Sequence, residues 1–470
     1  MPAVMVQGTS SWAGKSLLTT ALCRHFSRNG RSVAPFKAQN MSNNARVVPG
    51  GEIGVAQYLQ ARAAGVEPDV RMNPVLIKPE GPDESQVVVS GQVDRQLSGL
   101  PWRDRASYLW PTIERSLRSL LAEFELVVME GAGSPAEINL KDIDLTNCRA
   151  AALAGARVLL VCDIDRGGAF AHLFGTWSLL GQADRERISG FVLNKFRGDV
   201  SLLAPAPERL EELTGVPIMG VVPWLEHWLP DEDGAAYGVE RSSDGPTVAV
   251  VRYPTASNLD EFKLLEQVAR IRWVHRAGDL SNVELLVLPG SKHVSRDLAW
   301  LRERGLADAV RARAREGGAI LGVCGGLQML GVELSSPPGV DGEAKGLGLL
   351  GVRTAFAPGK LTRLVSPRFR DEVDEPWQKL AGAEFSGYEI RNGVTVPVEG
   401  STVEALTDGL GWQAGPVLGL SVHGLFEDAE VLRRLFGRPP ASSLDDALDE
   451  LADSVVAGLD VAAIEAIAGC

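Results

Sequence analysis

Short apolar runs alternate with amphipathic stretches over residues 1–235 of the chain. Residues 15–28 carry apolar positions at helical spacing, and this pattern ends at Asn29-Gly30, a combination typical of a helix terminus. Near-continuous apolar strands between helices indicate a parallel sheet that is covered on both faces. The predicted strands are Ala3–Gln7, Ser32–Phe36, Leu126–Met129, Val158–Cys162, Gly190–Leu193 and Ile218–Val222.

The same alternation resumes after a polar, glycine-rich stretch over residues 231–246, which is typical of a linker. A charged helix is predicted from Val294 to Glu316, because its arginines alternate with alanines and acids as on a solvated face. The strands predicted here are Thr247–Arg252, Leu285–Leu288 and Ala319–Val323. The sequence thus predicts a second α/β domain.

The segment after Arg438 contains no Lys or Arg but many acids. Its leucines and valines recur at steps of three and four, and Ser443 with Asp446 resembles a capping box, so we predict one amphipathic helix that docks on another surface. The predicted divisions are a first domain over 1–235, a linker over 236–246, a second domain over 247–437 and an acidic C-terminal helix over 438–470.

The composition is that of a folded protein with more than one domain: 470 residues, 45% of them hydrophobic. A formal net charge of −13 disfavours binding to nucleic acid. No apolar run approaches the roughly 20 residues that a membrane span needs, and the first residues lack a secretory pattern. Five cysteines without a C-x-x-C pair indicate neither disulfides nor a zinc knuckle. We therefore expect a cytoplasmic protein without membrane or nucleic-acid partners, and a homo-oligomer stays an open hypothesis.

A glycine-rich loop, Gly8-Thr-Ser-Ser-Trp-Ala-Gly14-Lys15-Ser16, joins the first predicted strand to the first predicted helix. In this context backbone N–H groups and the helix N-terminus face an anion, and the lysine adds a positive charge. Five residues, rather than the usual four, separate the two glycines, and this longer loop resembles the dethiobiotin synthetase branch of P-loop enzymes. The predicted nucleotide-binding residues are Gly8, Thr9, Ser10, Ser11, Gly14, Lys15 and Ser16.

Magnesium needs oxygen ligands from the protein besides the nucleotide phosphates. The Ser16 hydroxyl is one candidate ligand. Glu130 is a second, because it follows the strand Leu126–Met129 at the carboxyl edge of the sheet, where ligands bind in open α/β folds. Glu52, in a glycine-rich loop, is a third, and a solvated surface acid is the alternative interpretation of either glutamate.

Three further polar segments follow predicted strands. Asp163, Asp165 and Arg166 are candidates to orient nucleotide or substrate, with mutual pairing as the alternative. Asn194-Lys195 is a candidate to read a nucleotide base, since an amide carries both a donor and an acceptor. An amide-rich string after the second strand suits a substrate with several carboxylates and amides, with a plain loop as the alternative; its candidates are Lys37, Gln39, Asn40, Asn43 and Asn44.

Cys324 lies between an apolar strand and Gly325-Gly326, which is typical of an elbow that exposes a nucleophile at a helix N-terminus and lowers its pKa. The N–H group after it, with a second one from Gly290 or Ser291, is suited to bind an oxyanion. His423, after another apolar run, is the candidate base of a Cys–His pair. The other internal cysteines are predicted to be structural.

Nine stretches, spread over nearly the whole chain, resemble the cobyric acid synthase family, the glutamine-dependent amidotransferases of cobalamin biosynthesis. They are Gln7–Ser16, Lys37–Asn44, Met72–Pro79, Glu130–Glu137, Asp163–Gly168, Leu193–Asp199, Cys324–Gly331, Gly387–Ile390 and His423–Phe426. The nine stretches together are specific for this family, whereas the first and the seventh stretch alone would not identify it.

This resemblance implies an N-terminal P-loop domain with a doubly wound parallel sheet, similar to dethiobiotin synthetase, and a C-terminal domain similar to class I glutamine amidotransferases. It implies that Cys324 and His423 release ammonia from L-glutamine, while ATP and Mg²⁺ activate carboxylates as acyl phosphates in the first domain. The implied substrate is the corrinoid adenosylcobyrinic acid a,c-diamide, amidated at its b, d, e and g side chains to cobyric acid. The implied oxyanion and glutamine-binding residues are Gly290, Ser291, Gly325, Gln328 and Tyr388.

The chain also departs from the family pattern. Class I glutaminases place a glutamate two residues after the catalytic histidine, where this chain has Leu425. The resemblance therefore implies a Cys–His dyad with a less firmly oriented His423 and slow free glutaminase activity, and Glu427 is not expected to substitute. The other departures are Trp12, His293, Leu327 and Arg391.

Two alternatives stay open on the sequence. The sister cobyrinic acid a,c-diamide synthases and related cell-wall amidotransferases share the domain order. The segments Lys37–Asn44 and Asp163–Gly168 nevertheless favour the cobyric acid synthase family. A non-catalytic P-loop regulatory ATPase fused to a degenerate glutaminase-like domain is the other alternative, and the presence of both Cys324 and His423 counts against it.

Overall fold

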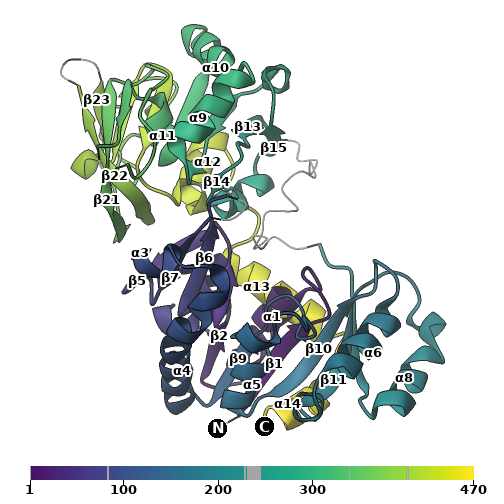
Figure 1. Ribbon diagram of the computed structural model, residues 1–470. Coiled ribbons are helices and arrows are strands. Elements are labelled where there is room, and N and C mark those ends of the chain that lie inside the picture. Colours follow the sequence, from purple (N-terminus) through teal and green to yellow (C-terminus); the bar gives the residue numbers. More distant parts are fainter. Residues whose placement is uncertain are drawn as a thin grey trace.

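The computed structural model describes residues 2–81, 84–226, 229, 245–337, 339–398, 400 and 402–469. Two α/β domains lie one above the other in Figure 1, and the end of the chain returns to the first of them. Most of the predicted linker over 236–246 lies outside the described residues. No helix in these ranges is long and apolar enough to cross a membrane.

The first domain is built on a parallel sheet with the strand order β12-β11-β10-β1-β9-β2. Val4 and Val6 face one layer of helices and Met5 faces the other, because alternate residues of a strand point to opposite faces. All six predicted strands are confirmed: β1 (Ala3–Gly8), β2 (Val33–Phe36), β9 (Leu126–Glu130), β10 (Arg157–Asp163), β11 (Ile188–Phe196) and β12 (Ile218–Pro223).

Helices cover both faces of this sheet, as predicted for a doubly wound fold. Helix α1 (Lys15–Arg28), which begins behind the glycine-rich loop, packs on one face together with helices from the end of the chain. The other face is covered by α4 (Arg105–Glu123), α5 (Cys148–Ala154) and α6 (Ala169–Leu179), with α7 (Gln182–Arg185) and α8 (Ala206–Thr214) toward one side.

A smaller lobe is inserted between β2 and β9 and is turned toward the second domain (Figure 1). It contains a sheet with the order β3-β6-β7-β8 beside the hairpin β4/β5. The strands of this lobe are not predicted from the sequence, because runs of three to five residues carry too little periodicity. Its elements are β3 (Gln39–Met41), β4 (Ala45–Val48), β5 (Gly51–Gly54), α2 (Val55–Ala63), β6 (Val75–Pro79), β7 (Ser85–Val89), β8 (Gln92–Asp94) and α3 (Arg95–Ser98).

The second domain is built on a sheet with the order β15-β13-β16-β18-β25-β24-β23, parallel from β15 to β25 and antiparallel at the other edge. Its buried strands β13, β16 and β18 confirm the three predicted ones. The strands are β13 (Thr247–Val251), β15 (Arg270–Val274), β16 (Leu285–Leu288), β18 (Ala319–Val323), β23 (Val403–Leu406), β24 (Gly411–Ala414) and β25 (Val417–Leu420).

The charged helix predicted over Val294–Glu316 is wrong as a single helix. The structure has α9 (Val294–Glu303) and α10 (Leu306–Arg315) instead. Gly305 lies between them with φ of 70°, in the left-handed region, where glycine ends a helix at little cost.

A long antiparallel hairpin, β21 (Val352–Val365) and β22 (Gly387–Pro397), reaches from the second domain to β4 and β5 of the lobe. It shares a sheet with β19 (Glu333–Ser335) and β20 (Ala344–Lys345). The remaining elements of this domain are β14 (Ala256–Ser257), β17 (Gly290–Ser291), α11 (Gly325–Leu330) and α12 (Ala429–Phe436).

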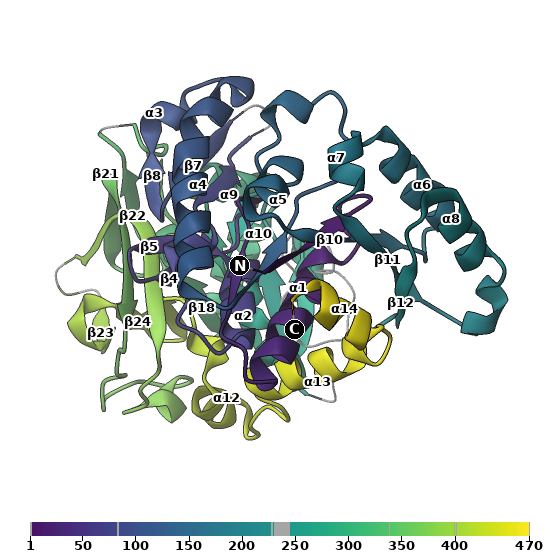
Figure 2. The same ribbon diagram turned by 90° about the horizontal axis from the view of Figure 1, so that it is seen from below.

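The acidic C-terminal segment packs on α1 of the first domain, as Figure 2 shows. It forms two helices, α13 (Leu444–Val456) and α14 (Val461–Ile467), where one was predicted. The helix is interrupted between α13 and α14 because the backbone there bonds to β12 instead. Val221 N–H of β12 donates to Gly458 O at 2.8 Å. Leu448 is buried in the shared core, and Arg24 of α1 pairs with Asp449 at 2.8 Å.

We expect Leu448→Ala to lower the free energy of unfolding of the first domain by about 2–5 kcal/mol, because it leaves a cavity between α13 and α1. Chemical denaturation followed by fluorescence measures this, with exposed Glu450→Ala on the same helix as the control. An equal effect of the two substitutions would contradict the packing of α13 described above.

Candidate functional site

The glycine-rich loop after β1 curls around the N-terminus of α1. Gly14 has φ of 99°, and a Cβ there would lie 1.9 Å from Asn194 Nδ2, so only glycine fits. Lys15 Nζ donates to the carbonyl oxygens of Ser10 and Gly133, at 3.0 and 3.2 Å. The loop therefore presents an ammonium group and a helix N-terminus at one place, as phosphate binding requires. The other predicted members of the loop are Gly8, Thr9 and Ser11.

The Glu130 carboxylate, at the end of β9, is buried beside this loop. Its Oε1 accepts hydrogen bonds from the Ser16 hydroxyl and from Lys37 Nζ, both at 2.8 Å. Its Oε2 accepts from Gln60 Nε2 at 2.6 Å and from Gln57 Nε2 at 3.4 Å. Both carboxylate oxygens are thus held in place at the mouth of the phosphate loop.

The oxygens of Ser16 and Glu130 fit a magnesium ion that is held together with nucleotide phosphates. Mg²⁺ prefers oxygen ligands and commonly takes only one or two from the protein. A hydroxyl and a carboxylate that contact each other beside the phosphate loop meet this need. Within the described ranges, no group of three or more His, Cys, Asp or Glu side chains could hold a metal by protein ligands alone.

Asn194 and Lys195 support the phosphate loop from behind. Asn194 Nδ2 donates to Ala13 O at 2.9 Å, and Lys195 Nζ donates to Trp12 O at 2.7 Å. Lys195 also pairs with Asp163 at 2.9 Å. These contacts hold the loop backbone, which favours a supporting role over the predicted reading of a nucleotide base.

The acids predicted after β10 lie at the same edge of the sheet. Arg166 pairs with Asp163 at 3.4 Å, and Asp165 pairs with Arg197 at 3.1 Å. The mutual pairing that was weighed as the alternative is therefore present, and it leaves the predicted substrate contact of these residues as a prediction.

The amide-rich string divides between several places. Asn40 is buried and donates to Gln57 at 3.0 Å, while Asn44 Oδ1 accepts from Leu259 N–H of the second domain at 3.3 Å. Asn43 lines a pocket at the domain boundary, and Gln39 begins β3 in a half-buried position. The contacts of Asn40 and Asn44, like that of Lys37 with Glu130, favour structural roles over the predicted substrate contacts.

Glu52 is placed away from the predicted metal site. Its two carboxylate oxygens pair with Lys78 of the lobe and Lys360 of the second domain. Burial raises the pKa of Glu52. The two lysines outweigh this effect and lower the pKa to about 2, so the carboxylate stays charged. These two ion pairs at the domain boundary favour a structural role for Glu52, and its predicted binding of magnesium stays a prediction.

Cys324 stands at the N-terminus of α11, directly after β18. Its φ of 51° and ψ of −104° are rare for a residue with a side chain and are typical of a strained nucleophile elbow. The turn needs glycine nearby, since a Cβ at Gly326 would lie 1.9 Å from Leu288 O. Cys324 Sγ lies 3.7 Å from Ile390 O and faces the pocket at the domain boundary.

His423 is held between Cys324 and a carboxylate that the sequence analysis missed. Its Nδ1 lies 2.9 Å from Glu261 Oε1, and Glu261 Oε2 accepts from Gly424 N–H at 3.0 Å. Burial lowers the pKa of His423. The Glu261 carboxylate and the hydrogen bond with the Cys324 thiol outweigh this effect and raise the pKa to about 10. The three side chains form a Cys–His–Glu arrangement, so the expectation of a weakly oriented dyad is wrong.

Glu261 lies 162 residues before His423 and belongs to a turn after β13. No spacing in the sequence links a carboxylate there to the histidine, which is why sequence reasoning could not find it. Glu427, weighed as a substitute, pairs with Arg46 of the lobe instead.

A candidate oxyanion hole lies beside the thiol. Lys292 N–H donates to Thr255 O, so the N–H of the preceding Ser291 points to the other side of its strand. That side faces Gly325, where an added Cβ would lie 2.7 Å from Ser291 N. Gly325 thus lies next to the backbone nitrogen of Ser291, which supports these two N–H groups as candidates to bind an oxyanion, whereas Gly290 packs against the His423 ring.

The Ser291 loop is fixed from behind by Asp297 of α9. Asp297 accepts hydrogen bonds from the Ser291 and Thr255 hydroxyls, both at 2.6 Å. Burial raises the pKa of Asp297 above its ordinary value, and the hydrogen bonds from Ser291 and Thr255 offset only part of that increase.

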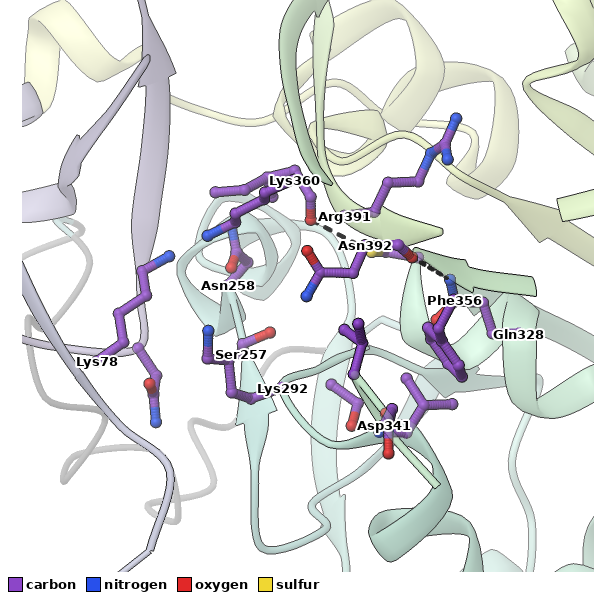
Figure 3. A pocket seen from close by; sticks show the side chains of 16 residues that line it. Lys78, Ser257, Asn258, Lys292, Gln328, Asp341, Phe356, Lys360, Arg391 and Asn392 are labelled. Atoms are coloured by element: carbon purple, nitrogen blue, oxygen red, sulfur yellow. Dashed lines mark hydrogen bonds between the residues drawn. The ribbon is translucent and has the colours of Figure 1, made fainter. Parts of the chain in front are cut away.

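The thiol opens into a pocket that is shared by the two domains (Figure 3). Lys78 and Asn43 reach it from the lobe, and Lys292 and Lys360 reach it from the second domain. Gln328, predicted to bind glutamine, lines this pocket and donates to the Asn392 carbonyl at 3.4 Å.

Tyr388 does not belong to the lining of this pocket. Its ring stacks on the His423 ring, with centroids 5.3 Å apart and planes 17° apart. Its placement behind the imidazole argues against the predicted direct contact with glutamine. Among the departures from the family pattern, Arg391 lines the pocket, Leu327 is buried, Trp12 is exposed on the phosphate loop, and His293 precedes α9.

A phosphate loop in one domain and a Cys–His–Glu arrangement in the other define a glutamine amidotransferase with a nucleotide-binding domain. Comparison with protein families agrees: residues 4–232 match the CobQ/CobB/MinD/ParA nucleotide binding domain, and residues 247–431 match the CobB/CobQ-like glutamine amidotransferase domain. The first match supports binding of ATP by the first domain.

Curated relatives match along nearly the full chain. A protein named cobyric acid synthase from Polaromonas sp. is 54% identical, covering 96% of this chain and 95% of its own. One of the same name from Variovorax paradoxus is 54% identical, covering 96% of each chain. A solved glutamine amidotransferase is 22% identical and covers 44% of this chain and 98% of its own, with a TM-score of 0.33. The chain belongs to the cobyric acid synthase family and is a glutamine-dependent amide ligase of cobalamin biosynthesis.

We expect Glu261→Gln to reduce the kcat of glutamine hydrolysis by about 10²- to 10⁴-fold, because it removes the group that orients and charges the imidazole. Glutamate release under saturating glutamine measures this, and the exposed Glu372→Gln serves as the control. Unchanged hydrolysis in the Glu261 variant would contradict the role of Glu261.

The same substitution has a predicted pH signature. Because the folded-state pKa of His423 is raised to about 10 from 6.5, its charge contributes stability fully below about pH 6.5 and loses this contribution as pH rises through about 10. The Tm difference between wild type and Glu261→Gln should therefore be largest near pH 6 and narrow toward pH 10. A difference that stays constant with pH would argue against the ion pair.

Proposed function

We propose that the protein amidates the b, d, e and g carboxylates of adenosylcobyrinic acid a,c-diamide, with one glutamine and one ATP for each. The names of its relatives support a corrinoid substrate. The observation that carries the coupling of the two halves is the pocket of Cys324, which Asn43 and Lys78 of the first domain help to line. Ammonia formed at the thiol would thus be released at the domain boundary.

In the glutaminase half, Cys324 is the proposed nucleophile and His423 the proposed base. The thiolate attacks the carboxamide carbon of glutamine, and the N–H groups of Ser291 and Gly325 bind the oxygen that becomes negative. The imidazolium then gives its proton to the departing ammonia, and water hydrolyses the thioester to glutamate. Glu261 holds Nδ1 and leaves Nε2 for the thiol.

In the synthetase half, Lys15 and the N–H groups of the phosphate loop bind the ATP phosphates. Ser16 and Glu130 are the proposed protein ligands of Mg²⁺, which would supply positive charge against the phosphate oxygens. A carboxylate oxygen of the corrinoid attacks the γ-phosphorus and displaces ADP, giving an acyl phosphate. Ammonia then attacks the acyl carbon and displaces phosphate, leaving the amide. ATP and glutamine as co-substrates support a cytoplasmic location.

The alternatives are less well supported. The relatives at 51–54% identity are named cobyric acid synthase rather than a,c-diamide synthase. A non-catalytic regulatory ATPase has no need for a thiol, an imidazole and a carboxylate in hydrogen-bonding contact.

We expect Cys324→Ala to abolish glutamine-dependent amidation and to retain amidation with ammonium salts, because only the nucleophile is lost. Mass spectrometry of the corrinoid counts successive exchanges of OH for NH₂ in the presence of ATP and Mg²⁺. Cys23→Ala, at a buried cysteine of the first domain, is the matched control. Full turnover with glutamine in the Cys324 variant would refute the assignment of the nucleophile.

We expect Glu130→Gln to raise the Mg²⁺ concentration for half-maximal ammonium-dependent amidation by about 10- to 100-fold, as for the loss of a metal-site contact. Titration of MgCl₂ at saturating ATP measures this, and exposed Glu211→Gln is the control. If the two variants titrate alike, Glu130 is not a ligand.

A further inference from the structure

A buried arginine of the nucleotide-binding domain reaches into the glutaminase domain. Arg46, in β4 of the lobe, leaves only 6% of its surface exposed. It pairs with Asp260 and with Glu427 of the second domain, both at 2.5 Å. Burial lowers the pKa of Arg46 but these two carboxylates raise it more, well above its ordinary value, so the guanidinium is always charged.

The guanidinium also lies within a stack of rings that ends at the catalytic histidine. Its Cζ lies 5.5 Å from the centre of the Tyr58 ring of α2 and 5.2 Å from that of Tyr388 in β22. The Tyr388 ring in turn stacks on His423, and two backbone hydrogen bonds of 3.2 and 2.9 Å join the same pair. A displacement of Arg46 therefore acts on the plane of the imidazole through one intervening ring.

The same segment also contacts the turn that carries Glu261. Asp260, the ion-pair partner of Arg46, directly precedes Glu261. Asn258 Nδ2 donates to Ala45 O at 2.9 Å and to the Tyr388 hydroxyl at 2.8 Å. The stacked Tyr388 ring thus contacts Arg46 of β4 directly, and the Glu261 carboxylate belongs to a turn whose residues Asn258 and Asp260 contact β4.

Helix α2 connects this contact to the phosphate loop. Its Gln57 and Gln60 donate to the Glu130 carboxylate beside the loop, and its Tyr58 lies against Arg46. One short helix thus touches both the proposed magnesium ligand and the arginine. Nucleotide and Mg²⁺ at Glu130 would act on α2 first, since α2 holds one of the two carboxylate oxygens.

We propose that Arg46 is a positioning residue of the glutaminase, which sets Tyr388 and the Glu261 turn against His423 and makes glutamine hydrolysis respond to the nucleotide site through α2. This inference deepens the proposed function and rests on it for the identity of the two reactions.

Two substitutions test this proposal. Arg46→Met should lower kcat for glutamate release from glutamine by about 10- to 100-fold, as expected for a misplaced catalytic group, and Arg46→Lys should recover part of it. Ammonium-dependent amidation, which does not use His423, should stay within about twofold of the wild type in both variants. Equal loss of both activities, or no loss of either, overturns the proposal.

Tyr58→Leu is the milder variant, since it removes one ring of the stack and leaves the ion pairs of Arg46 in place. We measure glutamate release with and without ATP and Mg²⁺. We expect the ratio of the two rates to fall toward one, with a smaller loss of the rate without nucleotide than in Arg46→Met. Tyr108→Leu, at an exposed tyrosine of α4, is the matched control. A wild type without stimulation, or a variant with full stimulation, overturns the coupling through α2.

These outcomes are separable from a failure of the proposed function. Glutamate release needs no corrinoid, so this assay tests the role of Arg46 even if adenosylcobyrinic acid a,c-diamide is not amidated. Absence of amidation in the wild type with ammonium salts would refute the proposed substrate alone.

Discussion

A carboxylate buried beside an imidazole is stable only if both of its oxygens are bonded, and Glu261 meets this condition through His423 and the backbone of Gly424. The rest of the glutaminase site follows from that contact. It fixes the tautomer and the plane of the imidazole, which in turn places the ring next to Cys324 at the strained start of α11. The turn that provides Glu261 is itself held by β4 of the other domain, so the geometry of the site depends on the domain boundary.

The two domains are held together at several independent places. Glu52 of the lobe pairs with Lys360 of the second domain, and Arg46 pairs with Asp260 and Glu427. Buried charges of this kind contribute little net stability, but an alternative domain arrangement that left one of them buried without its partner would cost several kcal/mol. The boundary is therefore favoured in one arrangement, the arrangement in which the thiol faces a pocket lined from both sides.

Contiguous motifs made much of this molecule predictable. The phosphate loop and the cysteine elbow each combine a strand, glycines and a helix start within about ten residues, so their chemistry could be placed from the sequence. Glu261 and the partners of Glu52 come from distant segments, and only the folded chain brings them together. The break at Gly305 was missed because the apolar periodicity continues across it, although a left-handed glycine ends the helix. The lobe was missed because its strands are short.

The return of the chain to its starting domain has a consequence for biosynthesis. Leu448, Leu451 and Val455 complete the apolar layer over α1, yet they follow the whole glutaminase domain in the chain. The nucleotide-binding domain therefore completes its apolar layer only after the glutaminase fold has been translated in full. A product that lacked α13 would retain an uncovered apolar face on α1. We expect proteolysis of such a product to begin in the nucleotide-binding domain.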